Sequence, residues 1–309
     1  MGALIEVILP VFLLIGAGYV SVWRGYFGPV AVDALMRFAQ KAALPCLLFR
    51  AISQLDLSQD FNLALLASYY IGAVLIFCAG LLGARFLFER SLEDSVAIGF
   101  VALFSNALLL GLPISERAFG PEHLWANYTI IAVHAPVCYL IGITTMEVIR
   151  TRGRSGVQMI RRVLTAMFSN ALIIGIALGF VVNLSGLTPP DMVSEALDMM
   201  ARAGLPAALF GLGGVLFQYR PEGDLRIIAY TVALSLIVQP ILVFGLGHVF
   251  ALEADALRPA VITAAMAPGV NAYLFADMYG RARRVAASTV LISTALCLLT
   301  AWIWLLILG

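Results

Sequence analysis

The chain has 309 residues, of which 62% are hydrophobic and only 12% charged, and its formal net charge is +1. Soluble domains are about 45–50% apolar and about one-quarter charged, so this composition excludes an ordinary soluble protein. No nucleic-acid partner is expected. In chain order, the sequence predicts ten apolar runs of about 20 residues, each long enough to cross a bilayer, at 3–22, 34–52, 61–84, 95–119, 124–148, 164–183, 192–217, 226–250, 257–278 and 285–308.

The predicted architecture is a single all-α membrane domain, 1–309. The loops between the runs are short and leave no room for a soluble domain. Backbone groups in hydrocarbon must hydrogen-bond internally, which favours helices, and the alternation over about ten residues that is typical of barrel strands is missing. The first run is too long for a cleaved signal peptide and lacks a leading basic residue.

The distribution of arginine predicts how the segments lie in the membrane. Most arginines fall in the odd-numbered loops, and the basic stretch TRGRSGV (151–157) lies in the fifth. Basic residues are enriched on the cytoplasmic side of membrane proteins. The odd loops are therefore predicted to be cytoplasmic. Both termini are predicted to lie outside, in a multi-pass protein of a bacterial inner membrane.

Two short matches at nearly the same spacing indicate an internal repeat. KAALPCLLF (41–49) resembles RAGLPAALF (202–210), and AFG (118–120) resembles MYG (278–280). Repeats of this kind are common in transporters. Each half holds five segments, an odd number, so the second half must be inverted relative to the first. The expected units are a first repeat at 1–150, a basic cytoplasmic linker at 151–163 and a second repeat at 164–309.

The fourth and ninth segments each contain residues that interrupt helices. FSNALLLGLPI (104–114) and AAMAPGVNAYLFADMYG (264–280) both carry proline, glycine and asparagine. Pro113 and Pro268 each lack an N–H and clash with a preceding carbonyl, which frees backbone groups at membrane depth. Such groups are tolerated where protein or a water-filled cavity satisfies them. Broken helices at matching places in two halves point to a binding site at the midplane.

The chemistry of these breaks favours an anion. Helix N-termini offer free N–H donors and partial positive charge. The amides of Asn106 and Asn271 can donate hydrogen bonds to a carboxylate without burying a charge. Gly111 and Gly269 allow the backbone to come close to a ligand. The alternative interpretation is a pair of proline kinks that neighbouring helices relieve.

Three motifs carry a resemblance to a known family. The SN…GLP of the fourth segment, the LPCLLF of the second (44–49) and the APGVNAYLFA of the ninth (267–276) are similar to motifs of the auxin efflux carrier family. That family includes plant PIN-type exporters and bacterial carriers described as malate or malonate permeases. The resemblance covers all ten segments. It implies the fold of the bile acid–sodium symporters, with segments 1, 2, 6 and 7 as a scaffold and segments 3–5 and 8–10 as a transport core in which 4 and 9 cross.

The resemblance also implies a mechanism and a site. The core would slide against the scaffold as an elevator and carry the substrate between the two faces of the membrane. In plant members an asparagine at the crossing holds the substrate carboxylate, and Asn106 and Asn271 are the matching positions. The expected substrate is a small mono- or dicarboxylate, auxin-like or malate/malonate-like. The candidate substrate-binding residues are Asn106, Asn271, Ser105, Gly111, Pro113, Pro268, Gly269, Tyr273, Pro45 and Leu47.

The sequence departs from the family pattern in two places. VHAPV (133–137) stands in the fifth segment where members often have an asparagine, and SNALIIG (169–175) stands in the sixth where Asn-Pro is frequent. His134 is a candidate for proton coupling, because imidazole titrates near neutral pH. The alternative is a histidine that hydrogen-bonds a backbone carbonyl.

Two basic residues inside the segments have competing interpretations. Lys41 could attract the anionic substrate, or its side chain could snorkel to a headgroup. Arg202 has the same two interpretations, and Asp198, which stands one helical turn before it, could neutralise its charge. The sequence has no convincing acidic cluster for a sodium site, so the coupling ion, H⁺ or Na⁺, stays open.

Signatures of enzymes are missing from the sequence. It has no G-x-x-x-x-G-K-[ST], H-E-x-x-H or G-x-S-x-G motif, and its three histidines and four cysteines lack metal-ligand spacing. No enzyme activity, cofactor or metal is therefore expected. The expected function is a secondary transporter of small organic anions. The alternatives are a sodium-coupled symporter of larger amphipathic anions such as bile acids, a channel, and an anion-binding membrane receptor. Lipid is an expected partner, and plant relatives suggest a homodimer.

Overall fold

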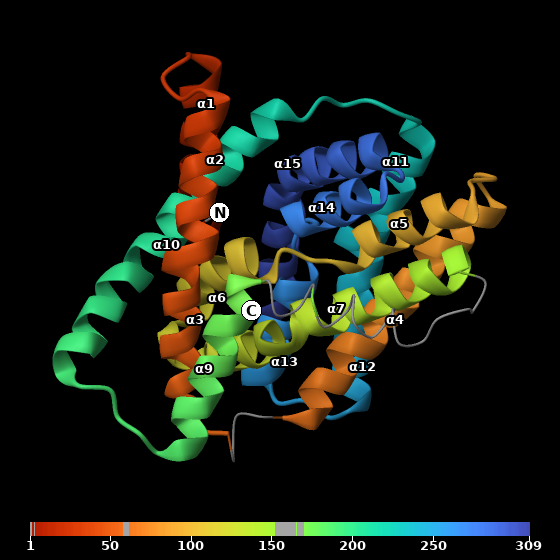
Figure 1. Cartoon of the computed structure of the whole chain (residues 1–309). Coiled ribbons are helices and arrows are strands. Elements are labelled where there is room, and N and C mark those ends of the chain that lie inside the picture. The colour runs from red at the N-terminus through yellow and green to blue at the C-terminus, as the bar shows by residue number, and fades with distance from the viewer. Residues whose placement is uncertain (1, 3, 58–61, 152–164, 166–169) are drawn as a thin grey trace.

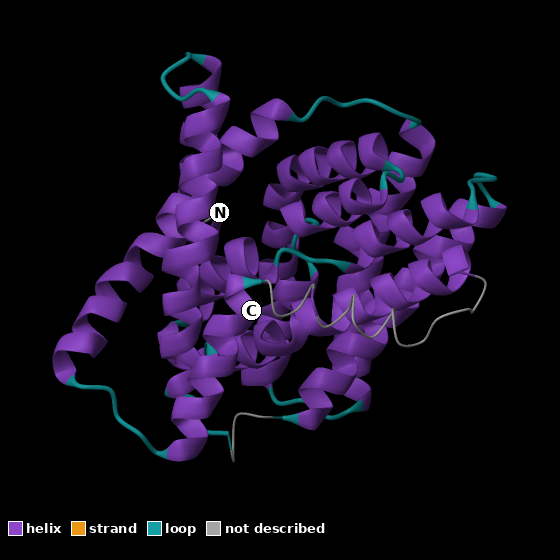
Figure 2. Cartoon of the chain, viewed as in Figure 1, coloured by secondary structure: helices purple, strands orange, loops and turns teal. Residues whose placement is uncertain are grey.

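The structure is a computed structural model that describes residues 2, 4–57, 62–151, 165 and 170–309. These residues form helices and connecting loops, with one isolated β-bridge and no strand (Figure 2). The all-helical prediction is confirmed for this part of the chain. The expected linker, from residue 152 on, and the first residues of the sixth segment lie outside the described residues.

Figure 1 shows a first group of helices that combines the N-terminal elements with two helices from the middle of the chain. In this first group α1 packs along α10, and α3 packs along both α9 and α10. Its elements are η1 (Leu4–Ile8), α1 (Leu9–Trp23), α2 (Pro29–Phe38), η2 (Ala39–Ala43), α3 (Leu44–Ser53), α9 (Ala171–Ser185) and α10 (Asp191–Gln218).

A second group contains the remaining described helices, and most of it lies to the right of the first in Figure 1. In this second group α4 packs along α5 and α12, α7 contacts α5 and α13, and α15 contacts α11 and α14. Its elements are α4 (Leu63–Phe86), α5 (Leu92–Leu103), η3 (Ala107–Gly111), α6 (Leu112–Phe119), η4 (Pro121–His123), α7 (Trp125–Thr151), α11 (Leu225–Ala233), η5 (Leu234–Val238), α12 (Gln239–Val249), α13 (Ala254–Ala264), α14 (Val270–Tyr279) and α15 (Arg283–Leu308).

Glycine makes the close contact between α1 and α10 possible. A Cβ on Gly18 would overlap the carbonyl group of Phe210, and a Cβ on Gly213 would overlap that of Ile15. Small residues at helix interfaces let backbones approach, which is the common way in which helices associate in membranes. The first group is therefore built on backbone contact between its two long helices.

Prolines set the positions of the π-helical turns. In the described part of the chain there are four such turns (η1, η2, η3 and η5), and each is followed two residues after its end by a proline. Proline cannot donate to the carbonyl four residues earlier and its ring clashes with it, so the preceding turn widens to i→i+5 bonds. The four prolines are Pro10, Pro45, Pro113 and Pro240.

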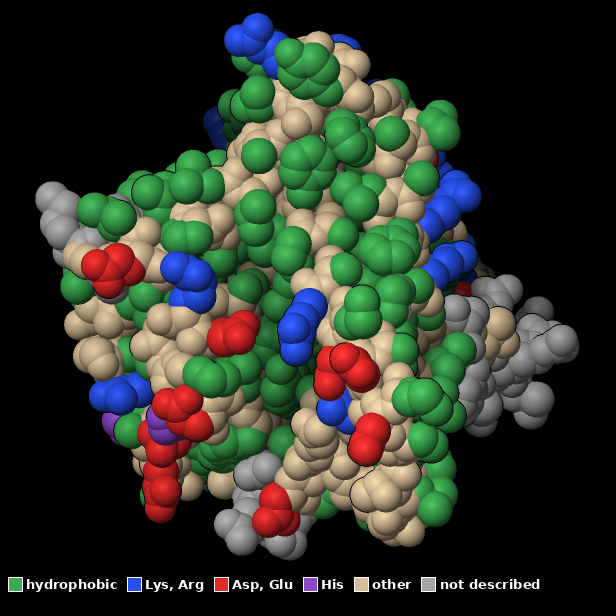
Figure 3. All heavy atoms as spheres, turned by 90° about the vertical axis from the view of Figure 1, so that its left-hand side faces the viewer, with side chains coloured by type: hydrophobic (Ala, Val, Ile, Leu, Met, Phe, Trp, Pro, Cys, Tyr) green, Lys and Arg blue, Asp and Glu red, His purple; other side chains and the backbone are tan. Residues whose placement is uncertain are grey.

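Six described helical spans are long and apolar enough to cross a membrane. Large apolar side chains stay exposed on them, for example Leu13 of α1 at 61% and Met199 of α10 at 69%, and Figure 3 shows apolar side chains over much of the face that α1 and α10 form. Exposed apolar surface of this extent is typical of lipid contact. The six spans are Ile5–Trp23, Leu63–Phe86, Trp125–Arg150, Asp191–Gln218, Leu225–Val249 and Arg283–Leu308.

The other four predicted segments depart from a plain spanning helix. The second runs from α2 through η2 into α3, and the described part of the sixth is α9 alone. The fourth and the ninth are each split in two, between α5 and η3 and between α13 and α14. These two splits position the candidate site.

Candidate functional site

The break in the fourth segment begins where α5 ends at Leu103. Phe104 and Asn106 leave the helical conformation, with ψ angles of 79° and 63°. The Asn106 side chain then accepts a hydrogen bond from the Leu109 N–H at 3.2 Å, which caps the helix that follows. The gap therefore lies ahead of Pro113, which follows the η3 turn and does not itself make the gap.

The break in the ninth segment lies between Ala264, the last residue of α13, and Val270, the first of α14. Pro268 lies inside this gap. Gly269 occupies the N-cap position of α14 in an extended conformation, with φ −77° and ψ 168°, and within the described chain no side chain caps α14. The first N–H groups of α14 therefore lack the partner that a capping side chain supplies elsewhere.

The two breaks lie against each other and run antiparallel. The Asn106 N–H donates to the Ala267 carbonyl oxygen at 2.9 Å, and the Gly269 N–H donates to the Phe104 carbonyl oxygen at 3.1 Å. Together they form the isolated β-bridge of the fold. Each break thus satisfies backbone groups that the other leaves free, as a membrane interior requires. We refer to residues 104–106 and 265–269 as the paired breaks.

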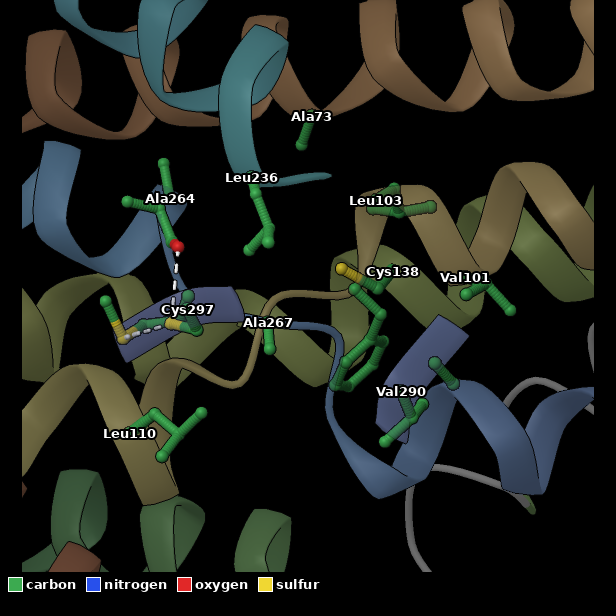
Figure 4. Packing of buried hydrophobic residues seen from close by; sticks show 14 of the residues in the cluster. Ala73, Val101, Leu103, Leu110, Cys138, Leu236, Ala264, Ala267, Val290 and Cys297 are labelled. Atoms are coloured by element: carbon green, nitrogen blue, oxygen red, sulfur yellow. Dashed lines mark hydrogen bonds between the residues drawn. The ribbon is translucent and has the colours of Figure 1, made fainter. Parts of the chain in front are cut away.

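Small apolar residues enclose the paired breaks on the side of α15. Leu103, Ala264 and Ala267 are fully buried, and Figure 4 shows Ala264 and Ala267 near Cys297. The Cys297 thiol is 3.7 Å from the carbonyl oxygen of Ala265. This side of the paired breaks is closely packed, whereas the other side borders open space.

On that other side a cavity of about 380 Å³ opens between the first and the second group. Ligand pockets in proteins measure roughly 300–1,000 Å³. Within the described chain no aspartate or glutamate lines this cavity, and Lys41 is its one charged lining residue. An anion would therefore meet no repulsive carboxylate here. The polar residues of the lining are Gln40, Lys41, Ser105, Asn106, His134, Tyr139, Asn170 and Asn271.

One asparagine belongs to the first break and the other follows the second break, and their side chains have different partners. The Asn106 side chain, 7% exposed, uses its oxygen in the cap of η3. Asn271 lies in the first turn of α14 and is partly exposed to the cavity, and its side chain has no hydrogen-bond partner among the described residues. The amide N–H groups of both side chains and the uncapped start of α14 converge as neutral donors on one cavity, an arrangement suited to a carboxylate.

A network of hydrogen bonds supports the first break from behind. The Tyr69 hydroxyl of α4 is 2.6 Å from the Ser105 hydroxyl. The Nε2 of His134, in the middle of α7, donates to the Ser105 carbonyl oxygen at 3.1 Å. Both rings are nearly fully buried. Ser105 is thereby held from two helices, and with it the adjacent Asn106.

Six of the predicted site residues lie outside this cavity. Pro113 and Leu47 line a separate recess with Arg50 and Arg117. Tyr273 packs against Tyr219, with ring centroids 5.0 Å apart. The six are Gly111, Pro113, Pro268, Tyr273, Pro45 and Leu47, whereas Ser105, Asn106, Gly269, Asn271, His134 and Lys41 line the cavity.

The possible ion pair between Asp198 and Arg202 is not formed among the described residues. Asp198 accepts two hydrogen bonds from Arg50, at 2.6 and 3.0 Å, which join α10 to the end of α3. A bidentate guanidinium–carboxylate geometry outcompetes a single contact along one helix. Arg202 stays exposed on the rim of the recess beside this pair.

Sequence reasoning missed two polar residues of the site. Asn170 caps α9 by accepting from the Leu172 N–H at 2.9 Å, and it lines the cavity opposite the breaks. Its signal was present in SNALIIG, as a capping residue at the start of an apolar run. Tyr69 gave no such signal, because a tyrosine in a spanning helix is common and its partner Ser105 is remote in sequence.

Comparison with known proteins identifies the family. The model of the membrane transport protein family matches residues 3–305, and the chain therefore belongs to this family. It is the auxin efflux carrier family that the three motifs predict, because its relatives include plant auxin efflux carriers. The chain is thus a multi-pass membrane transporter.

The relatives come from bacteria, archaea and plants. A protein of Rhizobium meliloti named "Putative malonate transporter" is 24% identical over 97% of this chain and 94% of its own length. "Auxin efflux carrier component 5" of Arabidopsis thaliana is 22% identical over 89% of this chain and 88% of its own length. "Uncharacterized transporter YfdV" of Escherichia coli is 22% identical over 96% of this chain and 95% of its own length.

Proposed function

We propose that this protein is a secondary transporter of small organic anions, mono- or dicarboxylates, and that it binds the substrate carboxylate at the paired breaks. The observation that carries the proposal is the convergence of Asn106, Asn271 and the uncapped start of α14 on one cavity. A carboxylate there would accept hydrogen bonds from the two amides and from the first N–H groups of α14. Its charge would also be favoured by the dipole of that helix.

The substrate class follows from the cavity and from the relatives. A volume of about 380 Å³ is near the lower end for ligand pockets, which favours a small acid over a bile acid. The similarity to a protein named for malonate extends over 97% of the chain, and similarity to auxin carriers also spans most of it. Malonate and indole-3-acetate are therefore the first acids to test.

The arrangement of the helices supports an elevator mechanism. We propose that the first group is the scaffold and the second group the transport core. The cavity lies where the two groups meet, and Leu44 of α3, Leu109 of η3 and Ala208 of α10 pack together at that contact. A seam of apolar side chains has few directional bonds to break when one body slides along the other. The carboxylate would travel with the paired breaks.

We further propose the membrane topology that the sequence predicts. It has ten segments in two inverted repeats of five, with both termini outside and the basic 151–157 stretch in the cytoplasm of a bacterial cell. In this topology the two breaks would occupy the fourth position of each half, and their antiparallel pairing is the relation that inversion would produce.

The direct test is thermal unfolding of the purified protein with malonate, malate, succinate and indole-3-acetate. A ligand that binds only the folded state stabilises it by about 2.7 kcal/mol at 100 times its Kd. We expect a saturable rise of the unfolding temperature with at least one acid, and its loss in Asn271→Ala. Asn62→Ala, which removes the cap of α4 away from the cavity, is the matched control and should keep the ligand effect. A wild-type protein that none of the acids stabilises would contradict the proposal.

A further inference from the structure

His134 occupies an unusual place for an ionisable residue. It lies in the middle of α7, is 4% exposed, and lines the same cavity as Asn106 and Asn271. Its Nε2 donates to the carbonyl oxygen of Ser105, the residue next to Asn106. The ring therefore touches both the backbone of the first break and the space where the substrate carboxylate would lie.

Among the described residues, the surroundings of His134 offer no fixed negative charge. Tyr69 and Tyr70 of α4 lie edge-on and tilted against the ring, with centroids 5.9 and 6.2 Å away, and Phe104 of the first break lies 4.8 Å away. The Cys138 thiol, one turn along α7, is 3.8 Å from Nδ1. Tyr139 is the other titratable residue of α7 at the cavity, and Lys41 faces it from η2. Within the described chain, no carboxylate lines the cavity.

The position of the second proton follows from these contacts. Because Nε2 donates to the Ser105 oxygen, neutral His134 carries its proton on Nε2, and Nδ1 is free to accept. An added proton would sit on Nδ1 beside the Cys138 sulfur, a weak acceptor. The protonated ring would then be a buried cation with no counter-charge, which is strongly unfavourable in a protein interior.

A bound carboxylate changes this balance. It would bring one negative charge into the cavity that His134 lines, and an opposite charge at close range favours the charged form of an imidazole. By linkage, the proton must strengthen carboxylate binding by the same factor as the carboxylate strengthens proton binding. Without substrate, the site would contain a neutral imidazole. With substrate, it would contain an imidazolium and a carboxylate, whose charges cancel.

We propose that His134 takes up one proton when a carboxylate binds at the paired breaks, so that the transporter carries the anion together with H⁺. This inference rests on the proposed function, because it needs a carboxylate in the cavity. It assigns the coupling ion, and it gives His134 a role distinct from that of the two asparagines, which would bind the anion without titrating.

The test counts protons at the moment of binding. Calorimetric titration with malonate or indole-3-acetate at pH 7.5, in two buffers that differ in ionisation enthalpy, gives the number of protons taken up. We expect about one for the wild type and close to zero for His134→Gln. The affinity of the wild type should fall by up to about tenfold per pH unit above neutrality, the limit for one linked proton. His248→Gln is the matched control, because His248 is exposed on α12 away from the cavity, and it should behave as the wild type does.

The outcomes separate the two proposals. Binding without proton uptake by the wild type, or equal uptake by wild type and His134→Gln, would overturn the role of His134 and leave the carboxylate site standing. Protonation of the acid itself would appear equally in both proteins and therefore cannot imitate the effect. If His134→Gln does not bind, the count is made on His134→Asn and on the wild type alone, where zero uptake overturns the proposal. Absence of binding by any acid to the wild type would overturn the proposed function and this inference together.

Discussion

The two breaks have the same pairing but are stabilised in different ways. The first is held by side chains: Asn106 caps η3, and Ser105 is bonded from Tyr69 and His134. The second has Gly269 at the start of α14 and, within the described residues, no capping side chain. The first break is thus satisfied internally, whereas the second presents unused donors to the cavity.

This difference assigns separate roles to residues that look equivalent in the sequence. Asn271 has no structural bond in the described chain, so its amide is available to a ligand alone. The two ends of the Asn106 amide have different roles. Its oxygen completes a helix cap, and only its N–H groups remain for a ligand. We expect substitution of Asn271 to affect binding alone, and substitution of Asn106 to affect binding and stability together.

The largest effect on binding is expected for Asn271→Ala. Hydrogen bonds to charged groups contribute about 1.5–3 kcal/mol, so the Kd for the carboxylate should rise by roughly tenfold to a hundredfold. The free energy of unfolding without ligand should change by less than about 0.5 kcal/mol, as for other substitutions without a structural partner. Calorimetric titration and thermal unfolding measure the two quantities. A large loss of stability would show that Asn271 has a structural role and would contradict the proposed difference between Asn271 and Asn106.

Asn106 sharpens the comparison because two substitutions separate its functions. Asn106→Ala should weaken binding and also lower the free energy of unfolding by about 1 kcal/mol, the usual cost of a lost N-cap. Asn106→Ser keeps a neutral capping oxygen but removes the amide N–H donors, so stability should be largely retained while binding weakens. Asn62→Ala is the control, because it removes the cap of α4 without changing the cavity. Equal stability of Asn106→Ala and the wild type would contradict the assignment of the cap.

The Tyr69–Ser105 hydrogen bond should make a smaller contribution that acts through the first break. Removal of one buried hydrogen bond costs about 1 kcal/mol, so Tyr69→Phe and Ser105→Ala should each be destabilised by that amount. A double-mutant cycle of these two substitutions should show a coupling energy of at least about 0.5 kcal/mol. Strictly additive effects would mean that the contact does not support the break.

The smallest effect concerns the ends of the two broken helices. Glu93, in the first turn of α5 and ahead of the apolar 95–119 run, accepts from Arg281, which follows α14, at 2.8 Å, and from Arg150 at 2.9 Å. Partial burial opposes ionisation of Glu93, but the two guanidinium groups outweigh it and hold the pKa of this carboxyl below its usual value. Since these groups are partly exposed, Glu93→Gln should cost only about 1 kcal/mol or less.

The pH dependence of this contact has a definite sign. Because the folded-state pKa of Glu93 is depressed, its stabilisation is complete above the unfolded value of about 4.3 and is lost as pH falls through the lower folded value. The difference in unfolding free energy between wild type and Glu93→Gln should therefore shrink on acidification below about pH 4.3. A difference that stays constant over that range would show that the charge of Glu93 is not what joins the two helices.

Much of the architecture could be predicted from local patterns in the sequence. Apolar runs of bilayer length predicted the helices. Proline, glycine and asparagine inside two of these runs predicted the broken segments. The motifs around Asn106 and Asn271 gave the family. These features are local, so one sequence suffices to recognise them.

Other features depend on contacts between remote segments and could not be predicted in the same way. The first gap opens at Ser105 ahead of Pro113, because pairing with the second break compensates the backbone there. Asp198 chooses Arg50 of another helix over its neighbour Arg202. The support of Ser105 by Tyr69 likewise joins two helices. In each case a residue from a remote segment determines the contact. The periodicity of one helix carries no information about which remote residue that is.

The most direct test of the central claim is exchange transport in proteoliposomes. Vesicles that contain the purified protein and an excess of the unlabelled acid that raises its unfolding temperature are diluted into the same acid in labelled form, and uptake is followed over time. We predict saturable uptake by the wild type and by Asn62→Ala, and near-background uptake by Asn271→Ala at equal protein content. Uptake by Asn271→Ala at the wild-type rate and affinity would contradict the claim that the paired breaks hold the substrate.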